Sequence, residues 1–139
     1  MISIIIVNYN QKSFLRSCLA SIYENFRSYP FEVIVVNNSP AEDLKDLQND
    51  FVIKLIQNDN KGYSQANNTG AAHSSGEYLF FLNADTLIRS DFLKDFTERF
   101  SGKDFGALGL KLYNEDGTFQ LSFWKENTFF NEIENKKDE

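Results

Sequence analysis

The stretch ISIIIV at residues 2–7 decides the fold, because all of its residues except Ser3 are apolar and β-branched. A continuous run of this kind is typical of a strand that is buried on both faces, as in a parallel sheet. Similar apolar runs follow at residues 31–36 (FEVIVV), 51–56 (FVIKLI) and 78–82 (YLFFL). Segments with helical character separate these runs. The alternation predicts an α/β domain with a mainly parallel sheet and right-handed crossovers.

The clearest helix is expected from about residue 12 to residue 26. Its apolar residues recur every three or four positions, which places them on one stripe of a helix. The members of this stripe are Phe14, Leu15, Cys18, Leu19, Ile22 and Phe26. Weaker helices are expected at residues 41–48 and 63–74. The second of these would bring only small residues, Ala66 and Gly70, against the sheet.

The last third of the chain continues the pattern less clearly. A helix should begin near Ser90, a good N-cap residue, with Asp91 favourable beside the helix N-terminus. Residues 106–113 predict one more strand, and a turn with Gly117 would lead into a hairpin partner. The 139 residues suffice for one domain. We expect that domain at residues 1–124, followed by a tail at 125–139 without a clear element.

Composition excludes several classes of protein. The formal net charge is −6 with no evident basic face, which argues against a nucleic-acid partner. The single Cys18 and the single His73 exclude an internal disulfide and a Cys- or His-cluster metal site. At helical spacing, Cys18 is expected to be a small buried apolar residue. No charged leader precedes the first strand, and no apolar run approaches the ~20 residues of a membrane span. These features predict a cytoplasmic location.

The predicted strands end in polar loops rich in amides. In an open α/β sheet, the ligand lies beyond the C-terminal ends of the strands. The loops there read NYN, NNS, NDNKG and NADT, at residues 8–10, 37–39, 58–62 and 83–86. Amide side chains offer donors and acceptors together, which suits the hydroxyls and base edge of a sugar nucleotide. The alternative interpretation is turn chemistry, because Asn also favours loops.

Other common nucleotide sites do not fit the sequence. No G-x-G-x-x-G follows the first strand, and no G-x-x-x-x-G-K-[ST] occurs anywhere, so a dinucleotide site and a P-loop are not expected. A receiver domain would need acids where this chain has Asn8 and Asn10.

Asp85 follows a buried strand, and a carboxylate there suits Mg²⁺ or Mn²⁺ bound together with diphosphate oxygens. Its alternative role is that of a turn or helix-cap aspartate.

Together these landmarks resemble glycosyltransferase family 2, in its rhamnosyltransferase-like branch. The resemblance covers residues 2 to about 122. The segments that carry it, in order, are ISIIIVNYNQ, EVIVVNNS, NDNKGYSQANNTG, GEYLFFLNADT and GALGLKLYNEDGTFQLS. It implies a GT-A fold, that is, a Rossmann-like parallel sheet flanked by helices, here ending before the half that binds the acceptor.

The resemblance implies roles for the first two loops. Asn8, Tyr9 and Asn10 match the loop that lines the nucleobase and ribose. Asn37, followed by Asn38, matches the position where the family usually has a base-contacting acid. The amide in this chain keeps the hydrogen-bonding capacity of that position and removes its charge.

The resemblance also implies roles for the later loops. Lys61 and Gly62 lie in the loop that approaches the nucleotide and the donor sugar. Asn83, Ala84 and Asp85 match the metal-binding D-x-D motif, with Asp85 as the expected ligand of Mn²⁺ or Mg²⁺.

The implied reaction is transfer of a sugar from a UDP- or dTDP-sugar to a glycan or lipid-linked acceptor of the cell surface, with inversion. The family's catalytic base lies beyond the matched segment and is expected after residue 139. Glu115 and Asp116 are candidates by residue type only, and we interpret them as turn residues. Such a protein would work in the cytoplasm or at the inner face of the membrane.

Aromatic and apolar residues near the end would pack on an acceptor half, or contact an acceptor or a second copy of the chain. These residues are Phe123, Trp124, Phe129, Phe130 and Ile133.

Two other functions stay open from the sequence. One is a non-catalytic module, or an inactive fragment, that binds a nucleotide sugar but lacks the base. The other is a structural or partner-binding α/β domain whose site is vestigial. Binding of UDP or dTDP with Mn²⁺ separates the last from the others, and a transfer assay separates the first two.

Overall fold

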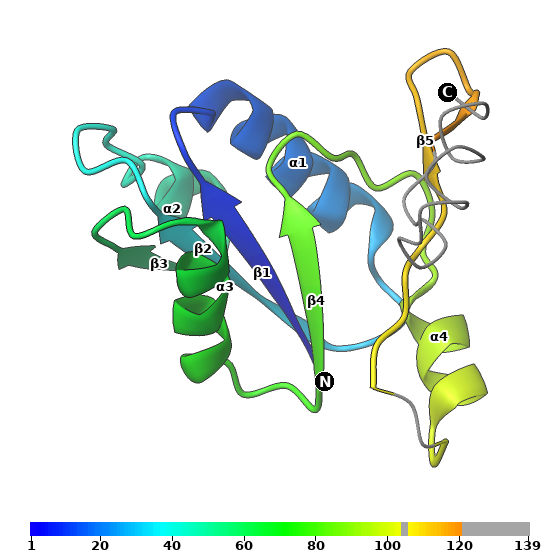
Figure 1. Ribbon diagram of the computed structural model, residues 1–139. Helices are drawn as coiled ribbons and strands as arrows, with labels where there is room; N and C mark the ends of the chain where they lie inside the picture. The colour runs from blue at the N-terminus through cyan, green and yellow to red at the C-terminus, as the bar shows by residue number, and fades with distance from the viewer. Residues whose placement is uncertain (104–105, 121–139) are drawn as a thin grey trace, which may run out of the picture. The chain divides into compact units, whose positions relative to one another are not determined.

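A computed structural model describes residues 1–103 and 106–120 of the chain (Figure 1). The chain divides into two compact units, Met1–Ser101 and Gly102–Glu139. The predicted boundary at residue 124 and the apolar residues 123–133 lie outside the described residues.

The first unit is built on a four-stranded parallel sheet with the strand order β3-β2-β1-β4. Its strands are β1 (Ile2–Asn8), β2 (Phe31–Asn37), β3 (Ile53–Gln57) and β4 (Tyr78–Asn83). All three strand pairs are parallel, with β1 between β2 and β4. Every residue of β1 is buried, as expected of a strand that is covered on both faces. The predicted parallel α/β fold is therefore confirmed.

Helices cover both faces of this sheet (Figure 1). Alternate side chains of β1 point to opposite faces, so Ile4 and Ile6 join one core cluster while Val7 joins another. The first cluster contains buried residues of α1 (Lys12–Asn25), α2 (Leu47–Asp50) and α4 (Leu93–Phe100). The second contains Ala66 of α3 (Tyr63–Ala72). The arrangement leaves the C-terminal ends of the strands free for a site.

The sheet-facing stripe of α1 is mostly as predicted. Leu15, Cys18, Leu19, Ile22 and Phe26 are buried, but Phe14 is 58% exposed. Each helical step turns about 100°, and the buried residues centre on the direction of Leu15. Phe14 stands one step away from that direction and therefore points to solvent.

The small face of α3 is confirmed and has a steric reason. A Cβ on Gly70 would lie 2.5 Å from Ile5 Cγ2 and 3.3 Å from Val36 Cγ2. The backbone of α3 therefore approaches the sheet more closely than any larger residue would allow. This approach sets the position of the loop before α3 at the edge of the sheet.

Two helices begin later than predicted. The helix expected at residues 41–48 is the single turn Leu47–Asp50, preceded by turns, although Leu44 and Leu47 are buried as expected. The helix expected from Ser90 begins at Leu93. Asp91 explains the later start, because its carboxylate accepts hydrogen bonds from the Arg27 and Ser28 amides at 2.8 and 2.7 Å. It thus binds the α1–β2 connection as well as the Leu93 amide of the helix, at 3.3 Å.

The second unit contains a short antiparallel hairpin of β5 (Leu112–Tyr113) and β6 (Phe119–Gln120). Gly117 has φ +84°, the conformation expected of the turn glycine. The strand predicted over residues 106–113 is limited to its last two residues. Every side chain from residue 106 to residue 120 is exposed, so no buried face extends the pairing.

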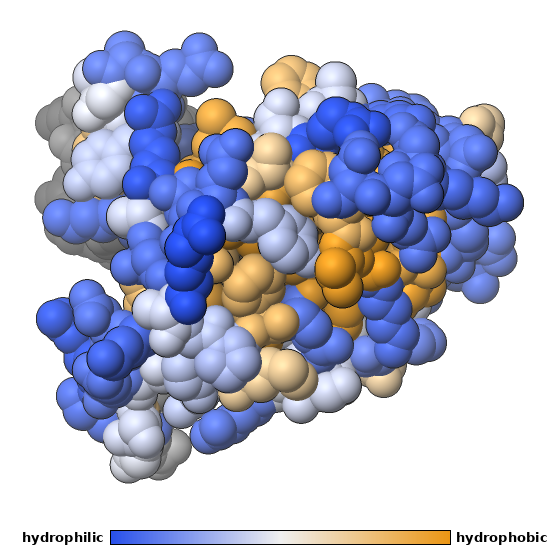
Figure 2. All heavy atoms as spheres, turned by 180° about the vertical axis from the view of Figure 1, so that it is seen from behind, coloured by the Kyte–Doolittle hydropathy of each residue, from blue (hydrophilic) through white to orange (hydrophobic). Residues whose placement is uncertain are grey.

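Large apolar side chains also reach the surface of the first unit, among them Val52, Leu79 and Phe81. Figure 2 shows the molecule from behind, with apolar atoms reaching the surface near the middle of that view among polar side chains. Within the described residues, no helix has the length and apolar character needed to cross a membrane.

Candidate functional site

The sheet register brings the predicted polar loops to one edge. Asn8 pairs with Asn37, Asn37 pairs with Gln57, and Val7 pairs with Asn83. Backbone hydrogen bonds continue this ladder beyond the strands, from the Asn38 amide to the Asn8 carbonyl at 2.8 Å and from the Asn58 amide to the Asn37 carbonyl at 3.0 Å. The loops after β1, β2, β3 and β4 therefore lie at the C-terminal edge of the sheet, where α/β proteins bind ligands.

Asn8 and Asn37 lie inside the protein at this edge, each with 0% exposure. Asn8 Nδ2 donates to Asn37 Oδ1 at 3.1 Å. Asn37 Oδ1 also accepts the Ser39 amide, while its Nδ2 donates to the Glu42 carbonyl and to Gln57 Oε1. These bonds use the full hydrogen-bonding capacity of the Asn37 amide. The structure thus places two of the predicted binding residues behind the surface of the site, in a supporting position.

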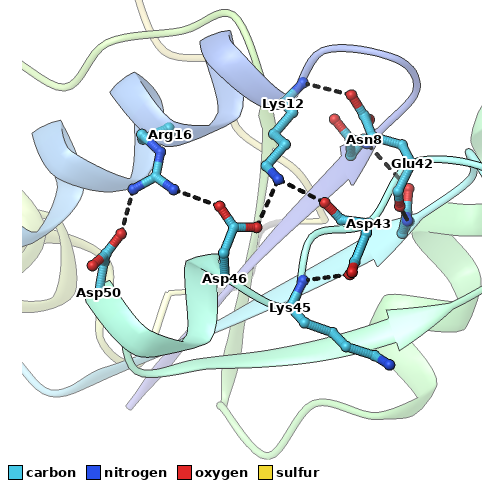
Figure 3. A network of polar contacts seen from close by, with 9 residues as sticks. Asn8, Lys12, Arg16, Glu42, Asp43, Lys45, Asp46 and Asp50 are labelled. Atoms are coloured by element: carbon cyan, nitrogen blue, oxygen red, sulfur yellow. Dashed lines mark hydrogen bonds and ion pairs between the residues drawn. The ribbon is translucent and has the colours of Figure 1, made fainter.

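Glu42 completes this buried network and was not predicted from the sequence. Its Oε2 accepts from Asn8 Nδ2 at 2.6 Å, and its Oε1 accepts from the Lys12 amide at 3.3 Å (Figure 3). Around it, Lys12 and Arg16 of α1 form ion pairs with Asp46, one of them at 2.7 Å. These outer pairs are partly exposed and contribute little to stability. Glu42 is a single acid in a turn, and no local sequence pattern indicates that it supports the site.

The exposed rim of the site begins with Tyr9 and Asn10, which follow the buried Asn8. Tyr9 is 56% exposed, and Asn10 adopts φ 55°, a left-handed conformation that Asn tolerates better than most residues. The Asn10 amide donates to Ser39 Oγ at 2.7 Å. Asn38 is nearly buried, and its Oδ1 accepts from Asn58 Nδ2 at 2.7 Å. The first two loops are thereby tied together, with Tyr9 and Asn10 facing solvent.

An open pocket of about 260 Å³ lies beside this part of the edge. Pro40, Gln57, Asn58 and Asp59 line it. Its walls come from the loops after β2 and β3. The β3 loop is one of the amide-rich loops predicted at this edge, but no local pattern indicates that Pro40 and Asp59 share a pocket.

Lys61 and Gly62 lie on the exposed loop that leads into α3. Gly62 has φ +100°, and its amide donates to Asn60 Oδ1 at 3.2 Å. Its carbonyl accepts the first backbone bond of α3, from Ala66, at 3.2 Å. Lys61 forms no hydrogen bond or ion pair with the described part of the chain. Its ammonium group is therefore available to an anion.

The loop after β4 contains Asn83, Ala84 and Asp85. Asn83 Oδ1 accepts a hydrogen bond from the Tyr63 hydroxyl at 2.8 Å, which ties this loop to the start of α3. Ala84 is buried, whereas Asp85 is exposed. Asp85 has no hydrogen-bond or ion-pair partner in residues 1–103 or 106–120. Tyr63 was not among the predicted site residues, although its position directly after Gly62 placed it at the same edge.

Cys18 lies beneath this loop. Its thiol contacts the Asn83 carbonyl at 3.8 Å. Burial, and then the negative charge of Asp85, raise the pKa of Cys18 to about 12. The thiol is therefore neutral near pH 7 and has the buried apolar role predicted for it.

The group predicted to hold a metal at this edge is the carboxylate of Asp85. The described residues contain no cluster of three or more His, Cys, Asp or Glu side chains that could hold an ion. Mg²⁺ is commonly bound by one or two carboxylates together with substrate phosphates and waters. The open carboxylate of Asp85 fits that arrangement.

The acids of the second unit have the turn role expected for them. Asp116 Oδ1 accepts from the Thr118 amide at 2.9 Å and from Thr118 Oγ1 at 2.6 Å, and these bonds lower the pKa of Asp116. Glu115 is exposed in the same turn. The catalytic base predicted beyond residue 139 stays a prediction.

Comparison with solved structures identifies proteins with the same fold. The crystal structure of Staphylococcus aureus TarS 1-349 aligns with a TM-score of 0.61 and 23% identity over 71% of this chain and 32% of that one. A mannosyltransferase from Pyrobaculum calidifontis, solved with GDP-Man and Mn²⁺, aligns with a TM-score of 0.60 and 23% identity over 73% of this chain and 32% of that one. The parallel sheet with flanking helices matches these GT-A glycosyltransferases, so the predicted fold is confirmed.

Sequence relatives lead to the same group. Glycosyltransferase GlyA of Streptococcus pneumoniae is 32% identical over 102 residues, which are 67% of this chain and 14% of GlyA. Glycosyltransferase EpsJ of Bacillus subtilis is 27% identical over 120 residues, which are 83% of this chain and 35% of EpsJ. The chain thus spans about a third or less of these relatives. The model of the family described as "Glycosyl transferase family 2" matches residues 3–139. The chain therefore belongs to glycosyl transferase family 2.

Proposed function

We propose that this chain binds the donor of a glycosyltransferase, a UDP- or dTDP-sugar, and that residues 1–124 form the donor-binding domain. The transfer would be to a glycan or lipid-linked acceptor of the cell surface, with inversion at the anomeric carbon. The observation that carries this proposal is the edge of the sheet, where Tyr9, Lys61 and Asp85 are exposed above a fixed layer of buried amides. The likeness to the rhamnosyltransferase-like branch stays a prediction.

The donor would lie along this edge with its base toward the first two loops. Tyr9 offers an exposed ring and Asn10 an exposed amide, which suit the base and ribose. Nearly buried Asn38 would contribute through its backbone and its contact with Asn58. Among solved relatives of the fold, TarS 1-349 has been obtained with UDP-GlcNAc and with UDP.

The diphosphate would lie toward Lys61 and Asp85. The protein carries a formal net charge of −6, so a bound diphosphate needs a local source of positive charge. Lys61 supplies one such charge. The backbone of Gly62, at the start of α3, adds the positive end of a helix.

Asp85 would hold Mn²⁺ or Mg²⁺ together with diphosphate oxygens, and Asn83 and Ala84 fix the loop that carries it. When bound, such an ion stabilises negative charge on the leaving diphosphate. Asn83 Oδ1 already accepts a hydrogen bond from the Tyr63 hydroxyl, whereas the Asp85 carboxylate is the charged oxygen ligand that the motif offers. The mannosyltransferase solved with Mn²⁺ supports a metal in this fold.

In the reaction, the acceptor hydroxyl oxygen bonds to the anomeric carbon while the bond from that carbon to the phosphate oxygen breaks. The electron pair leaves with the nucleoside diphosphate, and a base takes the hydroxyl proton. A donor-binding module without transfer is the second candidate. It is favoured by the role of Asp116, an acid that the sequence left as a possible base and that is committed to its own turn.

Calorimetry tests the proposal directly. UDP, dTDP and UDP-GlcNAc should bind with Mn²⁺, and a chelator should weaken that binding. GDP serves as the control for base selection. Absence of binding by all of these nucleotides, with and without Mn²⁺, would overturn the proposal. A transfer assay with a glycan acceptor then separates the enzyme from the binding module.

A further inference from the structure

We propose that Glu42 is the positioning residue of the donor-binding rim. Its carboxylate joins the end of β1 to the start of α1, and its backbone joins both to the end of β2. In this way it holds Tyr9, Asn10 and Asn38 in the geometry that receives a nucleoside diphosphate. The inference rests on the proposed function for the identity of its ligand.

The contacts of Glu42 reach three separate elements, and Figure 3 shows those with Asn8 and Lys12. Oε2 accepts from Asn8 Nδ2 at 2.6 Å, and Oε1 accepts from the Lys12 amide at 3.3 Å. The Glu42 carbonyl accepts from Asn37 Nδ2 at 2.9 Å. Asn8 is fully buried, so loss of the Glu42 carboxylate would leave one N–H of the Asn8 amide without its acceptor, which costs more than an exposed bond contributes.

Glu42 also acts as a long-range cap of α1. Gln11, the N-cap residue of this helix, makes no side-chain cap bond in the described structure, and the first turn of the helix contains no acid. The Glu42 carboxylate supplies both the acceptor and the negative charge that a helix N-terminus favours. Because Glu42 comes from the turn after β2, this cap links that turn to the loop after β1.

The rim residues lie between the residues that Glu42 contacts. Tyr9 and Asn10 stand between Asn8 and Lys12 in the chain. The turn that contains Glu42 closes through its amide to the Ser39 carbonyl at 2.9 Å, and Ser39 Oγ in turn accepts the Asn10 amide at 2.7 Å. The left-handed conformation of Asn10 is thereby supported from both sides. Glu42 acts on the donor only through these neighbours.

The experiment compares Glu42→Ala with a matched control, Glu32→Ala. Glu32 is a partly buried carboxylate of the same sheet that accepts bonds from Ser3 Oγ and the Ser75 amide, each at 2.6 Å. Ser3 and Glu32 pair near the N-terminal ends of β1 and β2, at the far edge from the rim. Both changes therefore remove a carboxylate that accepts two hydrogen bonds, but only one of them lies at the proposed site.

Affinity for UDP with Mn²⁺ is measured by calorimetry well below the melting temperature of each variant. Glu42→Ala should weaken binding about tenfold or more, because the rim is no longer preorganised. Glu32→Ala should lower the melting temperature and leave affinity within about twofold. Glu42→Gln keeps the size of the side chain and one acceptor oxygen, so it should recover part of the affinity. If Glu42→Ala does not fold, Glu42→Gln carries the same comparison.

Two outcomes of calorimetry overturn the proposal: unchanged affinity in the Glu42 variants, or an equal loss in Glu32→Ala. If the wild-type protein binds no nucleotide, that result contradicts the proposed function and not the positioning role of Glu42. In that case, amide hydrogen exchange without ligand decides the positioning role. Faster exchange of the Asn10 and Lys12 amides in Glu42→Ala, and not in Glu32→Ala, supports it; equal exchange in both variants overturns it.

Discussion

The Tyr63 hydroxyl donates a hydrogen bond to Asn83 Oδ1 at 2.8 Å, which joins the first residue of α3 to the last residue of β4. Lys61 and Gly62 directly precede Tyr63, and Asp85 lies two residues after Asn83. The bond therefore links the loop that offers a cation to the loop that offers a carboxylate. Both side chains are exposed, so the bond contributes more to the geometry of the edge than to stability.

Tyr63→Phe tests this link. Removal of the hydroxyl should weaken UDP binding severalfold, because Asn83 and the loop of Asp85 lose their orientation, while the free energy of unfolding changes by about 1 kcal/mol or less. Calorimetry and urea unfolding measure the two effects. Tyr23→Phe is the control, since it removes a hydroxyl bonded to the Val52 carbonyl, away from the site. Equal affinity in wild type and Tyr63→Phe would contradict the role of the bond.

Asp85→Ala tests the metal site. UDP should still bind weakly, but Mn²⁺ should no longer tighten the binding, because the open carboxylate of the motif is gone. Calorimetric titrations with and without Mn²⁺ give the comparison. Asp95→Ala makes the same charge change at an exposed position of α4 and should leave the effect of Mn²⁺ intact. A full Mn²⁺ effect in Asp85→Ala would assign the metal to other residues.

Gly70→Ala tests the packing of α3. Alanine would gain about 1 kcal/mol of helix propensity. The added Cβ would overlap Ile5 Cγ2 at 2.5 Å in a fully buried position, and overpacking costs about 1–3 kcal/mol. Urea unfolding should therefore show a net loss of stability. Gly109→Ala is the control, since a Cβ there meets nothing within 4 Å. If Gly70→Ala is more stable than wild type, the sheet shifts enough at Ile5 to make room for the added Cβ.

Asp91 should make stability depend on pH. Burial opposes its ionisation, but hydrogen bonds from the Arg27 amide, from Ser28 and from the Leu93 amide outweigh this and hold the pKa of Asp91 below its usual value. Its contribution is present above the unfolded-state pKa of about 4 and is lost as the pH falls through the lower folded-state pKa.

The measurement for Asp91 is urea unfolding of wild type and Asp91→Asn between neutral and acid pH. Wild type should be the more stable near pH 7, and the difference should shrink below about pH 4 as the carboxylate is protonated. Glu24→Gln changes an exposed acid whose side chain has no bond in the described structure and should show no such trend. A difference independent of pH would mean that the charge of Asp91 does not matter.

Cys18 should resist thiol reagents in the folded protein. It is the only cysteine of the chain, it is fully buried, and its pKa is raised to about 12 by burial and by the charge of Asp85. At about pH 8 an aromatic disulfide reagent should therefore react slowly with native protein and rapidly in denaturant. Because burial is the larger cause, Asp85→Ala should react slowly as well. Rapid reaction of native protein would show that α1 opens readily.

The sequence alone determined the parallel sheet and the edge at which we propose the site. A strand covered on both faces must be apolar at successive positions, and residues 4–7 and 33–36 satisfy that condition. The same holds for the buried stripe of α1, because its spacing reflects the helical period. Asp85 could be proposed as a metal ligand in advance, since it is an isolated acid in the loop after the fourth apolar run, and that role stays a prediction.

Only the tertiary structure decided which polar residues face a ligand and which face one another. Asn8 and Tyr9 are neighbours in the sequence, yet the first is buried and the second is exposed. The partners of Asn8 are Asn37 and Glu42, 29 and 34 residues away. Hydrogen bonds over such separations depend on strand register and on the path of the turns. The spacing of residues along the sequence specifies neither the strand register nor the path of the turns. The buried layer that supports the proposed site could therefore be identified only from the tertiary structure.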